Sequence, residues 1–197
     1  MSVSKGISEI IIANDEQSNK IASLKKVSDI DKNLCVVFGD LIITGAKEHH
    51  INEIAELWAN HASIQQINSP ERYNFKLEKS DWREFVKNKL NKKQNLLLVA
   101  HDKDNTEIKG FLYLQTITIP SSELILKAVV EDIYTEPQYR RQGIATKLLN
   151  VTLDFLSRHF IKQVDLITLI NTPSLSEFYR KNVSNNKDNI HLEIIVL

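Results

Sequence analysis

The chain has 197 residues, and its 25 Lys and Arg balance its 25 Asp and Glu, so the formal net charge is zero. This length suits one domain with a real core, and the neutral balance gives no electrostatic reason to expect nucleic acid or an anionic membrane as a partner. The apolar runs are too short to span a bilayer, and residues 1–20 are too polar for a signal peptide. One cysteine, Cys35, excludes an internal disulfide and fits a cytoplasmic protein.

Residues 1–40 are predicted to form an N-terminal extension of unclear role, followed by the main domain at residues 41–197. An added sheet edge, a cover over a cleft and a contact in a homodimer all remain open for the extension. Cys35 lies in the apolar run LCVVF, which favours a buried core cysteine over a nucleophile. The predicted elements of this segment are a strand over residues 8–13, a polar helix over 15–27, a strand over 34–38 and a turn at Gly39-Asp40.

Beyond the extension, the periodicity predicts helices and strands in a regular order. Apolar residues recur at helical spacing from His49 onward, and a second helix is predicted near Asp81, which has capping-box spacing to Glu84. Strands are predicted over residues 41–45, 95–101 and 108–119 and through Glu131, with turn residues at Asp104-Asn105, and the last three strands form an antiparallel meander.

Three histidines, His49, His50 and His61, raise the question of a metal site. None of them has ligand-type partners at a recognised spacing. We therefore expect solvated or cap-associated histidines and no bound metal.

The most informative stretch covers residues 128–149, AVVEDIYTEPQYRRQGIATKLL. An apolar strand carries Glu131 and Asp132 and ends at Pro137, because proline cannot donate to a sheet ladder. A basic turn containing Gly143 comes next, and then a helix with apolar residues at helical spacing. The N–H groups at a helix start have no intrahelical partner, and small residues let an anion approach. This turn is therefore predicted to bind a pyrophosphate group.

The run Arg140-x-x-Gly143-x-Ala145, in this strand-turn-helix context, resembles the acyl-CoA-binding motif of the GNAT superfamily, (Gln/Arg)-x-x-Gly-x-(Gly/Ala). The resemblance implies an α/β (α+β) fold with a twisted, mainly antiparallel mixed sheet flanked by helices. It also implies an enzyme, an acyltransferase with acetyl-CoA as co-substrate. By the same resemblance, acetyl-CoA is held by Ile133, Tyr134 and Thr135 along the strand and by Arg140, Arg141, Gln142, Gly143, Ile144, Ala145 and Thr146 at the turn.

A second cluster near the C-terminus extends the resemblance. Residues 163–170 are typical of a buried strand, and Pro173 suits the first position of a helix that carries Tyr179. The family has a strand, an Asn and a helix ending in Phe-Tyr-x-(Lys/Arg) here, so Asn171 is expected to bind the cofactor. Among the branches, the sequence resembles the diamine and polyamine acetyltransferases most. The sequence departs from the family pattern in two ways. One extra residue lies between Asn171 and Tyr179, and the closing hairpin is shortened, with one last strand predicted over residues 191–196.

The expected chemistry is acetyl transfer to an amine. An amine with a pKa near 10.4 is only about one part in a few thousand neutral at pH 7, so a proton acceptor is needed. By resemblance to the polyamine branch, Glu131 is expected to be this base rather than Asp132, and a strand bulge there would make side-chain alternation a poor guide. Tyr179 matches the family's general acid, which protonates the leaving thiolate. The resemblance implies direct transfer in a ternary complex, without a covalent enzyme intermediate.

The acceptor is expected to be a primary amine of a small molecule, and the acidic residues Glu123, Glu131 and Asp132 are compatible with a cationic one. A protein amine, either a Lys side chain or an N-terminus, is an alternative acceptor. A non-catalytic acyl-CoA-binding regulatory module is a second alternative. In a third, the turn serves another nucleotide or only the fold.

Overall fold

The structure, a computed structural model, describes residues 34–68, 70, 79–103, 107–119, 125–159, 161–168, 172–184 and 190–197. The strand predicted over residues 8–13, the helix predicted over 15–27, the turn at Asp104-Asn105 and the predicted cofactor residue Asn171 lie outside the described residues. No helix within the described ranges is long and apolar enough to cross a membrane.

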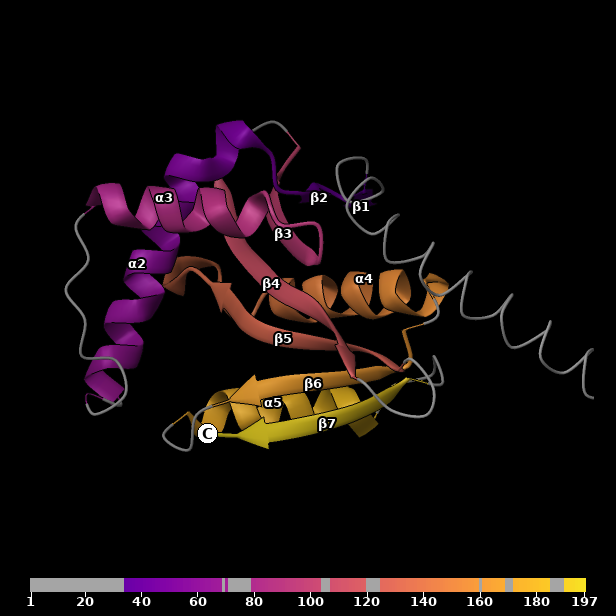
Figure 1. Ribbon diagram of the computed structural model, residues 1–197. Coiled ribbons are helices and arrows are strands. Elements are labelled where there is room, and N and C mark those ends of the chain that lie inside the picture. The colour runs from indigo at the N-terminus through magenta and orange to yellow at the C-terminus, as the bar shows by residue number, and fades with distance from the viewer. Residues whose placement is uncertain are drawn as a thin grey trace, which may run out of the picture.

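The described residues form a central sheet of seven strands, which follow one another in chain order (Figure 1). The first five strands are antiparallel, whereas the last three run parallel to one another. The predicted mixed, mainly antiparallel sheet is therefore confirmed. The strands are β1 (Cys35–Phe38), β2 (Leu41–Gly45), β3 (Asn95–Asp102), β4 (Ile108–Ile119), β5 (Ile125–Thr135), β6 (Gln163–Thr168) and β7 (His191–Val196).

Helices cover both faces of the sheet (Figure 1). Helices α2 (Ile51–Asn68) and α3 (Lys79–Leu90) lie on one face, and α4 (Ile144–Arg158) lies on the other. Helix α5 (Pro173–Ser184) connects β6 to β7 and contacts both strands, so these two strands form a parallel crossover in place of a hairpin.

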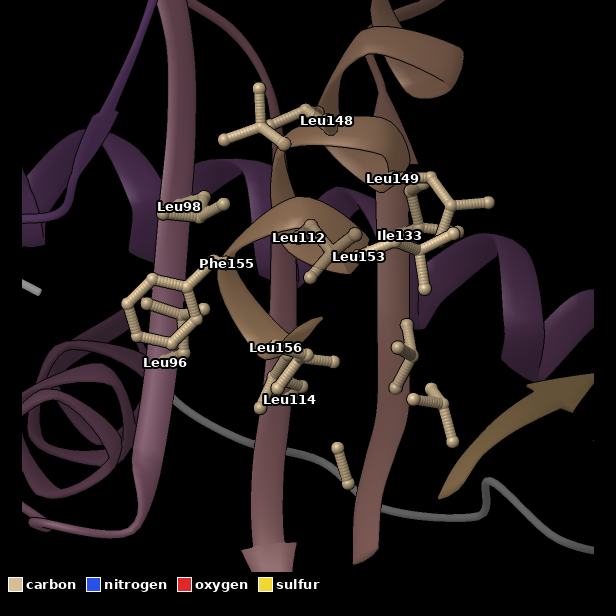
Figure 2. Close-up of a cluster of buried hydrophobic side chains, with 14 of the residues drawn as sticks. Leu96, Leu98, Leu112, Leu114, Ile133, Leu148, Leu149, Leu153, Phe155 and Leu156 are labelled. Atoms are coloured by element: carbon tan, nitrogen blue, oxygen red, sulfur yellow. The ribbon is translucent and has the colours of Figure 1, made fainter. Parts of the chain in front are cut away.

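The alternation of side chains along the strands supplies two hydrophobic clusters, one on each face. Figure 2 shows the larger cluster, in which α4 packs on the strands. From α4 the labelled members are Leu148, Leu149, Leu153, Phe155 and Leu156, and from the strands they are Leu96, Leu98, Leu112, Leu114 and Ile133.

The prediction of a buried Cys35 is wrong, because its side chain is exposed. The apolar run did predict the strand correctly, but β1 is the outermost strand of the sheet. Its side chains alternate between exposed and half-buried, so Val37, which points the same way as Cys35, is also exposed.

Candidate active site

A β-bulge in β5 changes the direction of two consecutive carboxylates. Tyr113 pairs with Asp132, and the next residue of β4, Leu114, pairs with Val130, which leaves Glu131 as the extra residue. In a regular strand Glu131 and Asp132 would point to opposite faces. Here both contact side chains from α2 or α3, on the same face of the sheet. The bulge that the resemblance suggested is thus present.

Glu131 has two partners on this face. Gln115 of β4 donates its Nε2–H to the Oε1 atom of Glu131. The Lys89 ammonium of α3 lies 3.4 Å from the Oε2 atom of Glu131. The Glu131 side chain is 28% exposed, so it remains within reach of a ligand.

Asp132 is held by two residues of α2. The indole Nε1–H of Trp58 donates to Oδ2 at 3.2 Å, and the Nε2 atom of His61 lies 3.1 Å from Oδ1. Trp58 and His61 are three residues apart and therefore share one face of the helix. The expectation of a solvated or cap-associated His61 is wrong, since its side chain is only 13% exposed. The apolar face of α2, continued one turn past Trp58, would have indicated that His61 points inward.

His50, in contrast, lies in a helix cap as predicted. Its Nδ1 atom accepts the Lys47 N–H at 3.0 Å, at the start of the 3₁₀ turn Glu48–His50. Burial, reinforced by nearby His49, His101 and Lys47, lowers the pKa of His50 to about 4. Within the described part of the chain, no three His, Cys, Asp or Glu side chains are grouped so as to hold a metal ion.

Strands β5 and β6 separate next to the bulge. Their pairing ends at Val130 and Leu166, although β5 stays paired with β4 as far as Thr135 and β6 with β7 as far as Thr168. Residues 131–135 of β5 therefore present backbone groups on the β6 side that have no ladder partner in β6. Such an edge can pair with an extended, amide-containing ligand.

Tyr179 of α5 is fully buried, within the cluster on the α4 face. Among the described residues its hydroxyl has no hydrogen-bond partner. Burial raises the pKa of Tyr179, and the negative charge of Asp132 raises it further. The phenol therefore stays protonated at neutral pH and can donate a proton. Tyr179 lies on the α4 face of the sheet, whereas the two carboxylates lie on the face covered by α2 and α3.

The turn before α4 leaves the start of that helix open. Gly143, the N-cap residue, has φ of 79°, and no side chain in the described part of the chain caps the helix. A Cβ atom on Gly143 would meet nothing within 4 Å among the described residues, so the space beside this residue is open. Arg141 also has a positive φ, 65°, which is unfavourable outside glycine and fixes the shape of the turn. This geometry suits a phosphate group.

Apart from Asn171, the predicted cofactor residues lie in one segment of the chain that runs from the second half of β5 into the first turn of α4. In the second half of β5, Ile133 and Tyr134 are buried and Thr135 is half-buried, and the Thr135 carbonyl accepts the Nε–H of Arg140 at 3.0 Å. The remaining members divide into the exposed turn residues Arg140, Arg141, Gln142 and Gly143, the buried Ile144, and the half-buried Ala145 and Thr146. The role of Asn171 stays a prediction.

A cavity beside this turn was not foreseen from the sequence. It has a volume of about 570 Å³ and lies between the β1–β2 turn, the end of β3 and the start of α4. No local motif marks it, because its walls come from distant parts of the chain. The lining residues are Phe38, Asp40, Leu41, Asp102, Lys103, Lys109, Gln142, Ile144 and Lys147.

The mixed sheet, with its bulge, two separating strands and a glycine turn at a helix start, has the fold of the solved acetyltransferase structures described below. Residues 93–182, from just before β3 into α5, match the family model described as an acetyltransferase (GNAT) domain. No curated protein sequence matches the chain. A second family model, O-phosphoseryl-tRNA(Sec) selenium transferase, matches residues 9–126. That match ends two residues into β5, before the bulge, the turn and α4, so the fold agrees with the first model.

Solved structures with the same fold cover most of the chain. A transcriptional regulator from Bacillus halodurans C-125 has a TM-score of 0.59 at 21% identity, over 72% of this chain and 90% of its own. A ribosomal-protein-alanine N-acetyltransferase from Brucella melitensis biovar Abortus 2308 has a TM-score of 0.58 at 18% identity, over 72% of this chain and 89% of its own. An aminoglycoside acetyltransferase from an uncultured soil metagenomic sample, in complex with trehalose, has a TM-score of 0.59 at 20% identity, over 77% of this chain and 93% of its own. At these identities the similarity establishes the fold.

Proposed function

We propose that the protein is an acetyl-CoA-dependent N-acetyltransferase that acetylates a primary amine of a small molecule. One observation carries the proposal. Strands β5 and β6 separate where the bulge turns Glu131 toward α3, and the buried Tyr179 hydroxyl, unpartnered among the described residues, lies near enough to Asp132 for the negative charge there to raise the pKa of Tyr179. A base, an acid and an open strand edge are what acetyl transfer from a thioester requires.

The chain's own residues fit acetyl-CoA. The backbone N–H groups of residues 141–146, in the turn and the first turn of α4, would take the pyrophosphate. The free edge of residues 133–135 would pair with the amide groups of the pantetheine. Acetyl-CoA supplies an activated acyl group with a thiolate as the leaving group.

Proton movement is assigned to two residues. Glu131 would take a proton from the ammonium group of the acceptor, directly or through a water molecule. Tyr179 would return a proton to the thiolate, and its raised pKa keeps the phenol in the required protonated form. Transfer is direct in the ternary complex, with no covalent enzyme intermediate.

The acceptor is proposed to be a cationic, polyamine-like amine. Glu131 and Asp132 place two carboxylates on the α2 and α3 side, and the rings of Trp58 and Tyr134 lie beside Asp132 or its partner His61. Carboxylates and aromatic faces together favour ammonium groups. A protein amine is the alternative acceptor, and the fold similarity to the Brucella enzyme, named for ribosomal-protein alanine, keeps it open.

Calorimetric titration with acetyl-CoA tests the proposal, with Gly143→Glu as the comparison. Glutamate places a side chain and a negative charge in the open space at the turn before α4, so we expect micromolar binding by the natural chain and at least about a hundredfold loss in the variant, consistent with removal of several charge-assisted hydrogen bonds. Gly39→Glu, at a second exposed glycine with positive φ and no neighbour within 4 Å, is the matched control.

An amine screen follows binding, with thiol release as the readout. Turnover that is lost in Glu131→Gln while acetyl-CoA binding persists supports the enzyme assignment. Binding without turnover on any amine would instead indicate the regulatory module. Absence of binding by the folded natural chain would leave only the fold.

A further inference from the structure

Lys89 occupies an unusual position for a lysine. Its ammonium lies 3.4 Å from Glu131 Oε2, 4.5 Å from the centroid of the Tyr113 ring and 5.3 Å from that of Phe85. The side chain is 22% exposed, so it packs against this surface rather than extending into solvent. Lys89 therefore holds a primary amine against the carboxylate assigned above as the base.

The other lysines that form ion pairs in the described part of the chain contact different carboxylates. Lys127 pairs with Asp165 at 2.7 Å, and Lys109 pairs with Asp102 at 2.7 Å. Asp165 and Asp102 lie outside the bulge. Lys89 pairs with the extra residue of the bulge itself, next to the point where β5 and β6 separate.

We propose that Lys89 is an acetylation site, and that the protein acetylates this lysine in cis when acetyl-CoA is bound. The proposal rests on the proposed function. It adds that α3 presents an internal acceptor amine to Glu131, in the position that an external amine must reach. A cation beside a carboxylate and over an aromatic ring is the arrangement that an external ammonium would also adopt.

The Lys89 ammonium gives one proton to the Glu131 carboxylate, and the neutral Nζ atom forms a bond to the carbonyl carbon of the acetyl group. The bond from that carbon to sulfur breaks, and the thiolate takes a proton from Tyr179. The nitrogen loses a second proton, which returns to Tyr179 through water, while Glu131 releases the first to solvent. The products are Nζ-acetyl-lysine, coenzyme A and one proton.

Acetylation would change the site. The product amide is neutral, so Glu131 loses its cationic partner and keeps the amide of Gln115. The base is then open to an external amine. The chemistry thus links the state of Lys89 to access of the acceptor.

Incubation of the purified full chain with isotopically labelled acetyl-CoA, without added amine, tests the acetylation of Lys89. Peptide mass spectrometry follows the label at Lys89 and at Lys87, an exposed lysine of the same helix that reports uncatalysed acetylation. General-base catalysis contributes about 10²–10⁴-fold, so we expect Lys89 to react at least about tenfold faster than Lys87. Lys89→Arg should abolish the fast phase of total labelling, and Lys87→Arg should leave it intact.

Four further outcomes decide the proposal. Loss of the fast phase in Glu131→Gln, together with a rate per molecule that is unchanged on dilution, supports acetylation in cis. A rate per molecule that falls in proportion to dilution overturns it, because the transfer would then occur between molecules. Equal labelling of Lys89 and Lys87 by a chain that binds acetyl-CoA overturns this inference alone, whereas failure to bind acetyl-CoA overturns the proposed function as well.

Discussion

Glu131 and Asp132 are neighbours in the chain, but their partners differ in how easily they move. Asp132 is held by Trp58 and His61 from the packed face of α2, whereas Glu131 is held by an amide and a lysine ammonium. A lysine ammonium is carried on a flexible four-carbon stem and can be displaced. Glu131 is therefore the carboxylate that an incoming amine can reach. Asp132 instead acts as a fixed negative charge that helps to keep Tyr179 protonated.

Tyr179→Phe separates the chemical role of the hydroxyl from its structural role. Among the described residues this buried hydroxyl has no hydrogen-bond partner. Its removal leaves no group newly unpaired, so we expect the free energy of unfolding to change by less than about 0.5 kcal/mol. Loss of proton donation to the thiolate should lower kcat about 10²–10⁴-fold. Urea unfolding and steady-state thiol release measure the two effects.

Tyr113→Phe is the stability control, since the Tyr113 hydroxyl is also buried and without a partner in the described residues. Both variants should unfold at about the same urea concentration as the natural chain. A loss of more than about 1 kcal/mol in Tyr179→Phe alone would mean that its hydroxyl is bonded. A kcat within about threefold of the natural value would remove Tyr179 as the acid, since a general acid contributes about 10²–10⁴-fold.

At the scale of elements, local periodicity is enough to predict a strand or helix where one face of the segment is buried. The bounds predicted for β4 and β7 agree with the structure, and α5 begins at Pro173 as expected. Apolar residues recur in these segments at the spacing of a strand or a helix, because one face of each segment is buried. The order of strand, glycine turn and helix around Gly143 was likewise evident from the sequence alone.

Contacts across the fold were not predictable in the same way. Trp58 and His61 meet Asp132 across more than 70 positions, and Lys89 meets Glu131 across 42. Sequence spacing carries no information on such pairs, because they depend on how α2 and α3 lie on the sheet. The exposure of Cys35 is not evident from the sequence for a similar reason, since an apolar run looks the same in a central strand and in an edge strand.

Gly110→Ala tests how closely β4 and β5 must approach below the cofactor turn. A Cβ at Gly110 would lie 2.5 Å from the carbonyl oxygen of Tyr134, so the backbone of β5 would have to move. We expect a loss of about 3 kcal/mol in the free energy of unfolding, the upper end for overpacking. Because the displaced residues belong to the free edge of β5, acetyl-CoA affinity should also fall.

Gly39→Ala is the matched variant. Its φ of 65° is unfavourable for alanine, but no atom lies within 4 Å of the added Cβ. The expected loss is about 1 kcal/mol, from backbone strain alone, with acetyl-CoA affinity unchanged. Equal losses in the two variants, measured by urea unfolding and calorimetry, would show that Gly110 is not required for strand approach.

At the scale of the whole molecule, one sheet joins two separate cores. The cluster under α4 and the cluster under α2 and α3 share the strands but have no side chain in common. The candidate site lies where the sheet opens, and the proposed acid, Tyr179, belongs to one core, whereas the two carboxylates lie on the face of the other. A ligand bound between β5 and β6 would contact both cores, and we expect acetyl-CoA to stabilise the whole domain against unfolding.

Acid stability of the whole domain is expected to depend on His50, which joins the start of α2 to the sheet. Its pKa is lowered from 6.5 to about 4, chiefly by burial. Between these two values the unfolded chain binds more protons than the folded one, so stability falls as the pH drops from 6.5 toward 4 and is fully retained above 6.5. Each unit of pKa difference corresponds to about 1.4 kcal/mol, which predicts a loss of up to about 3 kcal/mol.

Urea unfolding of His50→Asn and His49→Asn across this range measures that loss. Asparagine retains a side-chain acceptor for the Lys47 N–H but does not titrate, so His50→Asn should lose about 3 kcal/mol less than the natural chain between about pH 7 and about pH 4. His49 is exposed, and His49→Asn should follow the natural chain closely. Parallel pH profiles for His50→Asn and the natural chain would show that carboxylates elsewhere, rather than this buried imidazole, set the acid limit of the fold.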